Sequence, residues 1–401
     1  MKGIGKLRRI FANHWEEYKL SEYKEKITKN IETNIKKVLA CRTLLLGEHI
    51  YECPKCKKQR RVPHSCKSRF CSVCGYIAIE NWITRRLPFL LKCEYHHVVA
   101  TIPATFRWMI KTNKTQALNM FAKTVSDTIL QWSKKRGFTP GIVIFFHSFG
   151  SSLKFHPHFH ALVTGGGIND KGQWVAINSL PGAALMEIFR AKFIANIKKL
   201  FKDGILKTKK KLRAIYAIIN KTYKKHWQFY TQRVSYNSMH TIAYCIRYAK
   251  KMIISEKRII NYNGKTVTIT SKVPDKNDKS KKTQVFYEFK VLDFIRFVIQ
   301  HIPDKYFRLI RYSGIYANRS GKKYAQARKI KQPLKSPRQI QKWRLRQHVR
   351  TGVDPLFCKT CQCAFVLKEI IPPLKSFATM SMKIIKLALQ LPVQTTIWDT
   401  S

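Results

Sequence analysis

Four histidines lie within a fourteen-residue stretch of a chain that has 13 in all: His147, His156, His158 and His160. His158 and His160 begin an apolar segment typical of a β-strand, where alternation sends both imidazoles to one face and Phe159 to the other. His147 lies in the preceding apolar segment, from which it can approach the same face. Three imidazoles on an open face can bind a divalent ion and leave positions for a phosphate oxygen. We therefore expect His147, His158 and His160 to bind a catalytic divalent ion and His156 to lie in a loop.

Two tyrosines have the spacing of paired nucleophiles. Tyr244 and Tyr248 fall in a segment, 238–251, that is typical of a helix, so their phenols lie on one face. A tyrosine that attacks a phosphodiester must lose its proton, and a metal-bound phosphate provides electrophilic help. Arg247 lies between them and is a candidate DNA contact. Aromatic pairs at this spacing more often pack in a core, so the spacing alone leaves that alternative open.

Residues 41–75 form a block rich in cysteine and histidine, which is typical of structural zinc. A Cys-x2-Cys knuckle places two thiolates on one side of a tight turn, as tetrahedral zinc requires. The simplest assignment is one zinc site formed by the two knuckles, Cys53, Cys56, Cys71 and Cys74. A possible second zinc site takes the remaining candidates, Cys41, His49, His64 and Cys66. Spacing alone does not fix the partners, so we expect one or two structural zinc ions.

Basic residues between the knuckles are candidate phosphate contacts: Lys57, Arg60, Arg61, Lys67 and Arg69. A further trio, Cys358, Cys361 and Cys363, forms a partial knuckle near the C-terminus without an obvious fourth ligand. We expect no metal at that trio.

The elements that must position these side chains can be read from periodicity. The apolar runs at 141–150 and 158–167 predict two strands, and their short connection predicts antiparallel pairing. Residues 96–103 predict another buried strand, and Asn263-Gly264 predicts a hairpin turn. Helical spacing of apolar residues marks five further segments, namely 7–18, 77–91, 116–135, 183–201 and 291–301.

The charge of the chain points to a polyanionic partner. Its 401 residues include 77 Lys and Arg but only 22 Asp and Glu, which gives a net charge of +55. That excess cannot be neutralised internally, and aromatic residues at 12% offer stacking surfaces that suit nucleic acid. Any single Lys-rich run, such as 207–225, 276–282 or 338–350, is either a DNA contact or a solvated face. No segment is apolar enough to span a membrane and the N-terminus lacks a secretory signal, so we expect no membrane partner and a cytoplasmic protein.

Several motifs in order resemble one known family. The blocks at 41–56 and 64–74, the strand at 96–103, the His-x-His segment at 147–167, Tyr244-x3-Tyr248 and the segment 296–319 are similar to the two-tyrosine rolling-circle insertion-sequence transposases of the HUH endonuclease superfamily. Their N-terminal zinc-binding domain is similar to residues 41–74. The resemblance covers most of the chain.

The resemblance implies an α+β fold, in which a central antiparallel sheet, the ferredoxin-like palm of HUH nucleases, is flanked by helices and preceded by a small zinc-binding domain. We expect a helical and zinc-binding domain at 1–92, a catalytic domain at 93–311 and a basic C-terminal region at 312–401.

The implied activity is metal-assisted nicking and rejoining of single-stranded DNA at the ends of a mobile element. The implied roles are metal ligands for His158 and His160, aided by Mg²⁺ or Mn²⁺, and nucleophiles for Tyr244 and Tyr248, through a 5′-phosphotyrosine. The implied partners are single-stranded DNA at the element's ends and the target DNA, in the bacterial cytoplasm at the nucleoid. Two alternatives are a replication initiator or relaxase with the same site, and a zinc-dependent DNA-binding protein without activity, such as a decayed transposase.

Overall fold

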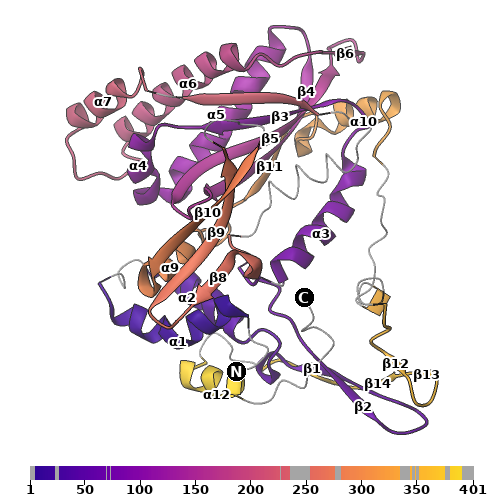
Figure 1. Ribbon diagram of the computed structural model, residues 1–401. Coiled ribbons are helices and arrows are strands. Elements are labelled where there is room, and N and C mark those ends of the chain that lie inside the picture. Colours follow the sequence, from indigo (N-terminus) through magenta and orange to yellow (C-terminus); the bar gives the residue numbers. More distant parts are fainter. Residues whose placement is uncertain are drawn as a thin grey trace. The chain divides into compact units, whose positions relative to one another are not determined.

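The fold is mixed helix and antiparallel sheet, as the ribbon of the computed structural model shows (Figure 1). The structure describes residues 5–22, 27–68, 70–72, 74–225, 227–234, 253–275, 281–334, 344–345, 348, 352–374 and 380–390. The expected α+β class is confirmed. None of the described helices is both long and apolar enough to cross a membrane.

The chain divides into two compact units that are each built from separate segments. The composite unit contains Met1–Asn81, Met252–Ile302 and Arg338–Ser401, and the sheet unit contains Trp82–Lys251 and Pro303–Pro337. Helix α3 (Cys74–Arg86) begins in the first and ends in the second. The predicted domains, with boundaries at residues 92 and 311, are continuous stretches of sequence. Each observed unit instead combines segments that are distant in sequence.

The sheet unit is built on one antiparallel sheet with the strand order β11-β4-β5-β3-β7, to which β6 adds by pairing with β5. The strands are β3 (Tyr95–Thr101), β4 (Thr139–Phe149), β5 (Phe155–Ile168), β6 (Trp174–Ala176), β7 (Gln228–Val234) and β11 (Ile310–Gly314). The expected antiparallel pairing of β4 with β5 is confirmed. Edge strand β11 was not predicted, because its five residues show no regular alternation of apolar and polar side chains.

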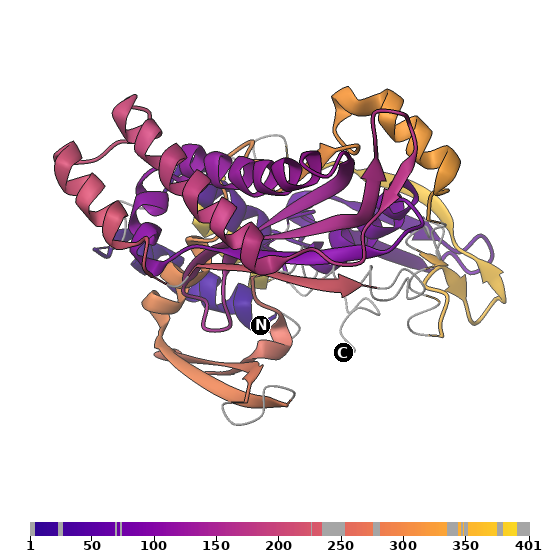
Figure 2. The same cartoon turned by 90° about the horizontal axis from the view of Figure 1, so that it is seen from above.

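Helices cover one face of this sheet (Figure 2). They are α4 (Arg107–Thr112), α5 (Lys114–Lys134), α6 (Gly182–Lys202) and α7 (Leu212–Lys221), and a last helix, α10 (Gly321–Ile330), follows β11. Helix α5 buries Phe121, Val125 and Ile129 at four-residue spacing, which explains why this segment is an amphipathic helix.

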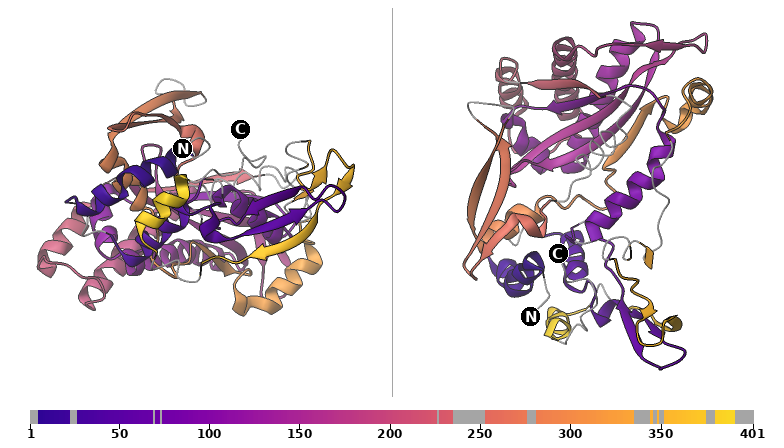
Figure 3. Two further views of the ribbon diagram at one scale, coloured as in Figure 1. Left: turned by 90° about the horizontal axis from the view of Figure 1, so that it is seen from below. Right: turned by 45° about the vertical axis from the view of Figure 1, so that its right-hand side comes forward.

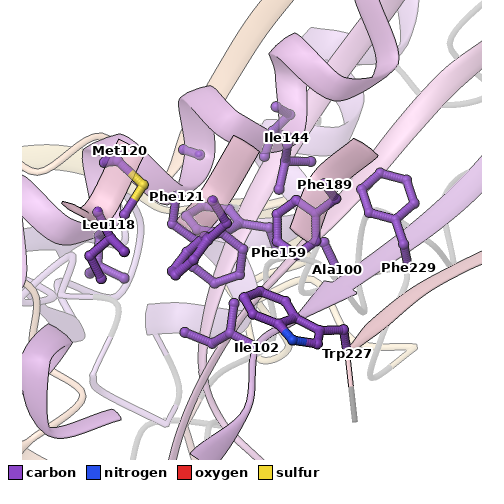
Figure 4. Packing of buried hydrophobic residues seen from close by; sticks show 14 of the residues in the cluster. Ala100, Ile102, Leu118, Met120, Phe121, Ile144, Phe159, Phe189, Trp227 and Phe229 are labelled. Atoms are coloured by element: carbon purple, nitrogen blue, oxygen red, sulfur yellow. The ribbon is translucent and has the colours of Figure 1, made fainter. Parts of the chain in front are cut away.

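The core lies between these helices and alternate residues of the strands. Phe159 of β5 contacts Phe121 of α5, with ring centroids 4.8 Å apart, and Phe189 of α6 lies beside them (Figure 4). Ile144 of β4 and Ala100 of β3 face the same core. Because neighbouring strand residues point to opposite faces, His158 and His160 must lie on the face away from α5 and α6.

The composite unit contains two small antiparallel sheets (Figure 1). The first has the order β14-β1-β2, with β1 (Glu48–Glu52), β2 (Gln59–Pro63) and β14 (Val366–Ile371). The second has the order β10-β9-β8, with β8 (Ile259–Tyr262), β9 (Thr266–Pro274) and β10 (Lys282–Lys290). The hairpin predicted at Asn263-Gly264 joins β8 to β9 and is confirmed, with Gly264 at a φ of +93°.

Four helices and a short hairpin complete the described part of the composite unit. They are α1 (Lys6–Leu20), α2 (Lys29–Leu39), α9 (Val291–Ile299) and α12 (Met382–Gln390), with the hairpin formed by β12 (Phe357–Cys358) and β13 (Cys363–Ala364). Helix α1 buries Leu7, Phe11, Trp15 and Tyr18, which confirms the predicted helical spacing.

Gly314 at the end of β11 gives a test of the sheet. Its φ is +61°, and a Cβ at this position would lie 1.8 Å from the carbonyl oxygen of Pro140. Gly137 has a φ of +75° but nothing within 4 Å of such a Cβ. We expect Gly137→Ala to cost about 1 kcal/mol of unfolding free energy through backbone strain, and Gly314→Ala ~3 kcal/mol or more, because the steric clash adds to the strain. Urea denaturation measures both, and equal losses would contradict the close approach of β11 to β4.

Candidate functional site

Three histidines converge on the sheet face opposite α5 and α6. His147 of β4 pairs with His158 of β5, and His160 follows two residues later on the same strand. Their candidate ligand nitrogens all lie within 4.8 Å of one another, and all three side chains are buried. The ring centroid of His147 lies 5.2 Å from that of His158 and 4.4 Å from that of His160. The structure thus brings together the three histidines that the alternation of strand residues predicted.

Hydrogen bonds select the nitrogens that this cluster can offer. The Nδ1 of His158 lies 2.7 Å from the carbonyl oxygen of His156, so Nδ1 carries the proton and donates it. The Nε2 of His158 is then left with a lone pair, which is the form that binds a metal. The Nδ1 of His160 lies 2.9 Å from the Nε2 of His97.

Burial favours the neutral form of His158 and His160. Desolvation lowers the pKa of His158 to about 4. Desolvation also lowers the pKa of His160, and the neighbouring histidines His147 and His158 lower it further. Neutral imidazoles are metal ligands, whereas protonated ones repel a cation. Three such groups suit a divalent ion with positions left for phosphate oxygens.

His97 is a member of this site that the sequence reading did not single out. It lies on β3, two residues from Val99, which pairs with His160, so alternation places it on the same face. Its ring stacks on that of His160 at 5.1 Å between centroids. The signal that could have found it is the doublet His96-His97 at the start of a predicted strand adjacent to the histidine strand.

His156, expected in a loop, lies within β5 near its start. Its Nδ1 accepts a hydrogen bond of 2.7 Å from the guanidinium of Arg107. Burial and that positive charge lower the pKa of His156. The guanidinium of Arg107 therefore lies against the ring of His156, and the backbone carbonyl of His156 orients His158.

The predicted nucleophiles Tyr244 and Tyr248, and the neighbouring Arg247, lie outside the described residues. Their roles stay predictions. Arg69, one of the predicted phosphate contacts, also lies outside the described part of the chain.

The block at residues 41–75 forms a four-cysteine cluster, but with partners other than those predicted. Cys41, Cys66, Cys71 and Cys74 lie together, with Sγ–Sγ distances of 3.6 Å for Cys41–Cys74 and 3.7 Å for Cys66–Cys74 and Cys41–Cys71. Hydrogen bonds from Cys41 and Cys66 lower the pKa of the Cys74 thiol. The pKa of Cys41 and Cys66 is raised in the same cluster, so thiolate, the form that binds zinc, is favoured at Cys74.

The two histidines of the predicted second zinc site do not join its two cysteines. His49 and His64 contact each other instead of the cysteines: His64 Nε2 lies 2.8 Å from His49 Nδ1, and His64 Nδ1 lies 2.8 Å from the carbonyl oxygen of Leu46. β1 and β2 pair as neighbours, and this pairing puts the two imidazoles side by side. The structure does not bring them to Cys41 and Cys66, because these two thiols cluster with Cys71 and Cys74 instead.

The other predicted knuckle also has different partners. Cys53 and Cys56 lie with Cys358 and Cys361, whose candidate ligand atoms are within 4.8 Å of each other. The prediction that Cys53 and Cys56 join Cys71 and Cys74 is therefore corrected. No fourth ligand was apparent for the C-terminal trio from sequence, but the structure brings Cys358 and Cys361 of that trio to Cys53 and Cys56. Hydrogen bonds from the backbone amides of Cys56 and Lys55 lower the pKa of the Cys53 thiol to about 6.

The basic residues between the knuckles differ in what they contact. Arg61 forms an ion pair of 2.5 Å with the buried Glu48, and Arg60 donates to the carbonyl oxygen of Pro355. Lys57 and Lys67 are exposed. Two of the five predicted phosphate contacts are thus engaged within the protein, and two are accessible.

Comparisons with known proteins agree with this organisation. Residues 10–102 match a family model described as "Transposase zinc-binding domain", and residues 141–323 match one described as "Putative transposase". The chain is 29% identical over 362 residues to the transposase for insertion sequence element IS801 of Pseudomonas savastanoi pv. phaseolicola, covering 84% of this chain and 83% of the relative. It is 28% identical over 339 residues to "Putative transposase y4qJ" of Sinorhizobium fredii (strain NBRC 101917 / NGR234), covering 80% and 84%.

No solved structure matches the chain. The two family models cover the zinc-binding block and the histidine cluster in the order that the motifs predicted. Both relatives are similar over most of their length. The chain is thus similar over most of its length to an insertion-sequence transposase, and its N-terminal part matches a transposase zinc-binding domain.

Proposed function

We propose that this transposase nicks and rejoins single-stranded DNA at the ends of its element through a 5′-phosphotyrosine, with a divalent ion held by His147, His158 and His160. The observation that carries the proposal is the convergence of these three buried imidazoles on one face of the sheet. When bound, Mg²⁺ or Mn²⁺ would polarise the scissile phosphate.

The protein's own residues have separate tasks in this scheme. His158 presents Nε2 because its Nδ1 donates to the His156 carbonyl oxygen. His97 orients His160 through the hydrogen bond between their rings. Partners of this kind fix the tautomer and the ring direction of a metal ligand.

The proposed nucleophiles are Tyr244 and Tyr248. The phenolic oxygen of one tyrosine forms a bond to phosphorus, and the bond from phosphorus to the 3′ oxygen breaks. The proton leaves the phenol and the departing oxygen gains one, so the products are a 5′-phosphotyrosyl enzyme and a free 3′-hydroxyl. The second tyrosine would serve in strand transfer. Support for these roles comes from the motif Tyr-x3-Tyr and from the family.

DNA is the partner of a transposase, and the composition suits it. The net charge of +55 leaves a large excess of cations after every carboxylate is paired. We propose single-stranded DNA at the element's ends, together with target DNA, as the substrates. The proposed place of action is the bacterial cytoplasm, at the nucleoid.

Two alternatives stay distinct from this proposal. A replication initiator or relaxase would share the histidine site, but the two relatives are described as a transposase and a putative transposase. A DNA-binding protein without nuclease activity would keep the zinc clusters and the charge. The first experiment below separates it from the proposal.

A covalent adduct tests the nucleophiles. Purified protein with Mg²⁺ or Mn²⁺ and single-stranded DNA carrying the element's ends should give a DNA–protein band on a denaturing gel. Tyr244→Phe and Tyr248→Phe should each reduce it, and the double variant should abolish it, because phenylalanine lacks the attacking oxygen.

His158→Ala with His160→Ala should also abolish the adduct while DNA binding remains. An adduct that survives in the tyrosine double variant would exclude these nucleophiles. Tight DNA binding without adduct on any strand, with either metal, would favour the non-catalytic alternative.

We expect substitution of His97 to weaken metal binding at the histidine site. His97→Ala should weaken Mn²⁺ binding by about 10- to 100-fold, because His160 loses the partner that orients it. His97→Gln, whose side chain keeps a polar group, should recover part of the affinity. Isothermal titration with Mn²⁺ measures both.

His96→Gln is the matched control, since alternation places this neighbour on the other face of β3. If His96→Gln and His97→Ala weaken Mn²⁺ binding equally, the cause is a loss of stability, and His97 does not position His160.

Salt dependence tests the DNA contacts. With about six phosphate contacts, the logarithm of affinity for single-stranded DNA should fall against the logarithm of salt concentration with a slope of about −4. A variant with Lys209, Lys210 and Lys211 changed to glutamine removes three exposed charges from one basic run.

A shallower slope in that variant would identify the run as a DNA contact, and an unchanged slope would identify it as a solvated face. Fluorescence anisotropy between 50 and 200 mM salt measures the slope. A flat dependence in the wild type would contradict electrostatic binding.

A further inference from the structure

The second cysteine cluster joins two Cys-x2-Cys knuckles from opposite ends of the described chain. Cys56 and Cys358 are 302 residues apart in sequence, yet their sulfurs lie 3.8 Å apart. Cys53 and Cys361 complete a set in which every sulfur is within 4.8 Å of the others. The matched zinc-binding domain ends at residue 102, so it accounts for one knuckle only.

The distances fit a single ion. Zinc–sulfur bonds of about 2.3 Å in a tetrahedron place neighbouring sulfurs about 3.8 Å apart. The sulfurs of Cys56 and Cys358 lie 3.8 Å apart, close to the 3.6–3.7 Å of the first cluster. A disulfide would need about 2.05 Å. An iron–sulfur cluster would hold its cysteines further apart, because the inorganic core lies between them.

The backbone gives an independent sign of the same site. Among the described residues, six that are not glycine have positive φ, and four of these directly follow a clustered cysteine: Arg42, Lys57, Lys67 and Gln362. Two belong to each cluster. Left-handed residues cost free energy and persist where the surrounding structure requires them. In the first cluster this turn brings the amide of Ser68 to 3.4 Å from the Cys66 sulfur. Both clusters are thus built as metal knuckles.

Each knuckle of the second cluster is held by a pair of strands. The first follows β1 and precedes β2, where Glu52 pairs with Gln59. The second joins β12 to β13, where Cys358 pairs with Cys363. Cys53 and Cys358 are buried with Leu356 and Phe365, and Arg60 stacks over the Phe365 ring at 5.5 Å. Two hairpin knuckles that face each other are the arrangement of a zinc ribbon.

We propose that Cys53, Cys56, Cys358 and Cys361 bind a second structural zinc ion, which fastens the C-terminal region to the zinc-binding domain. Cys363 is a fifth cysteine, adjacent to Cys53 but outside the four that are mutually close. Lys55 and Lys359 lie within the knuckles and offset the charge of four thiolates. β14 pairs with β1, so the segments that the ion joins are already neighbours (Figure 3).

The ion would close a long loop. Because the entropy lost on closing a loop grows with its length, a clip between residues this far apart removes much freedom from the unfolded chain. We therefore expect the zinc to contribute to the stability of β14 on β1. The inference does not depend on the proposed nicking reaction, so either can fail alone.

Metal content tests the proposal. The purified full chain should hold two zinc ions by inductively coupled plasma mass spectrometry, one for each cluster. Cys358→Ser with Cys361→Ser should reduce this to one. Cys363→Ser is the matched control, since it removes a cysteine of the same hairpin, and it should keep two.

Thiol alkylation of the wild-type protein is a second test, and it does not depend on whether a cysteine variant folds. With zinc bound, Cys53, Cys56, Cys358 and Cys361 should resist a thiol reagent and Cys363 should react, as mass spectrometry of peptides would show. A chelator should expose all five. Two zinc ions in the double variant, one zinc ion in the wild type, or equal reactivity of Cys361 and Cys363 with zinc present would each overturn the proposal.

Discussion

The register between β4 and β5 is the constraint on which the histidine site depends. Because His147 pairs with His158, one face of the sheet receives the imidazoles and the other receives Phe146 and Phe159 for the core. A slip of β5 by one residue would turn His158 and His160 towards the core beneath α5 and α6 and turn Phe159 to the opposite face. The same apolar packing that stabilises the sheet therefore sets the direction of the metal ligands. Stability and chemistry in this unit share one register.

The chemistry of the site matches the composition of the whole chain. With few carboxylates in the chain, the candidate metal ligands are histidine and cysteine, and the excess of positive charge stays available to DNA. Neutral imidazoles add no negative charge that would repel a phosphate. The buried Glu48 is one of the few acidic groups inside the composite unit, and Arg61 neutralises it. The candidate metal sites thus differ: cysteines form the proposed structural ones and histidines the proposed catalytic one.

Sequence patterns predicted the parts of the structure that depend on local periodicity. Alternation in 158–160, the short connection between β4 and β5, and the Asn-Gly turn at residue 263 each follow from neighbours along the chain. The partners of the cysteines do not, because a knuckle spacing specifies two ligands on one turn and says nothing of the other two. The assignment of Cys53 and Cys56 to Cys71 and Cys74 failed for this reason. His97 was not predicted as part of the site for a related reason, since its role depends on the pairing of β3 with β5.

The pairing of β1 with β14 has a consequence for synthesis of the protein. The ribosome makes the β1–β2 hairpin early, while the strand that covers its open edge emerges some three hundred residues later. At about 5–20 residues per second, that interval is roughly 15–60 s. During this time the edge of β1 and the Cys53–Cys56 knuckle stay exposed to other nascent chains and to chaperones. Translation speed thus sets how long the β1–β2 hairpin lacks its third strand, and the composite unit cannot be completed before β14 has been synthesised.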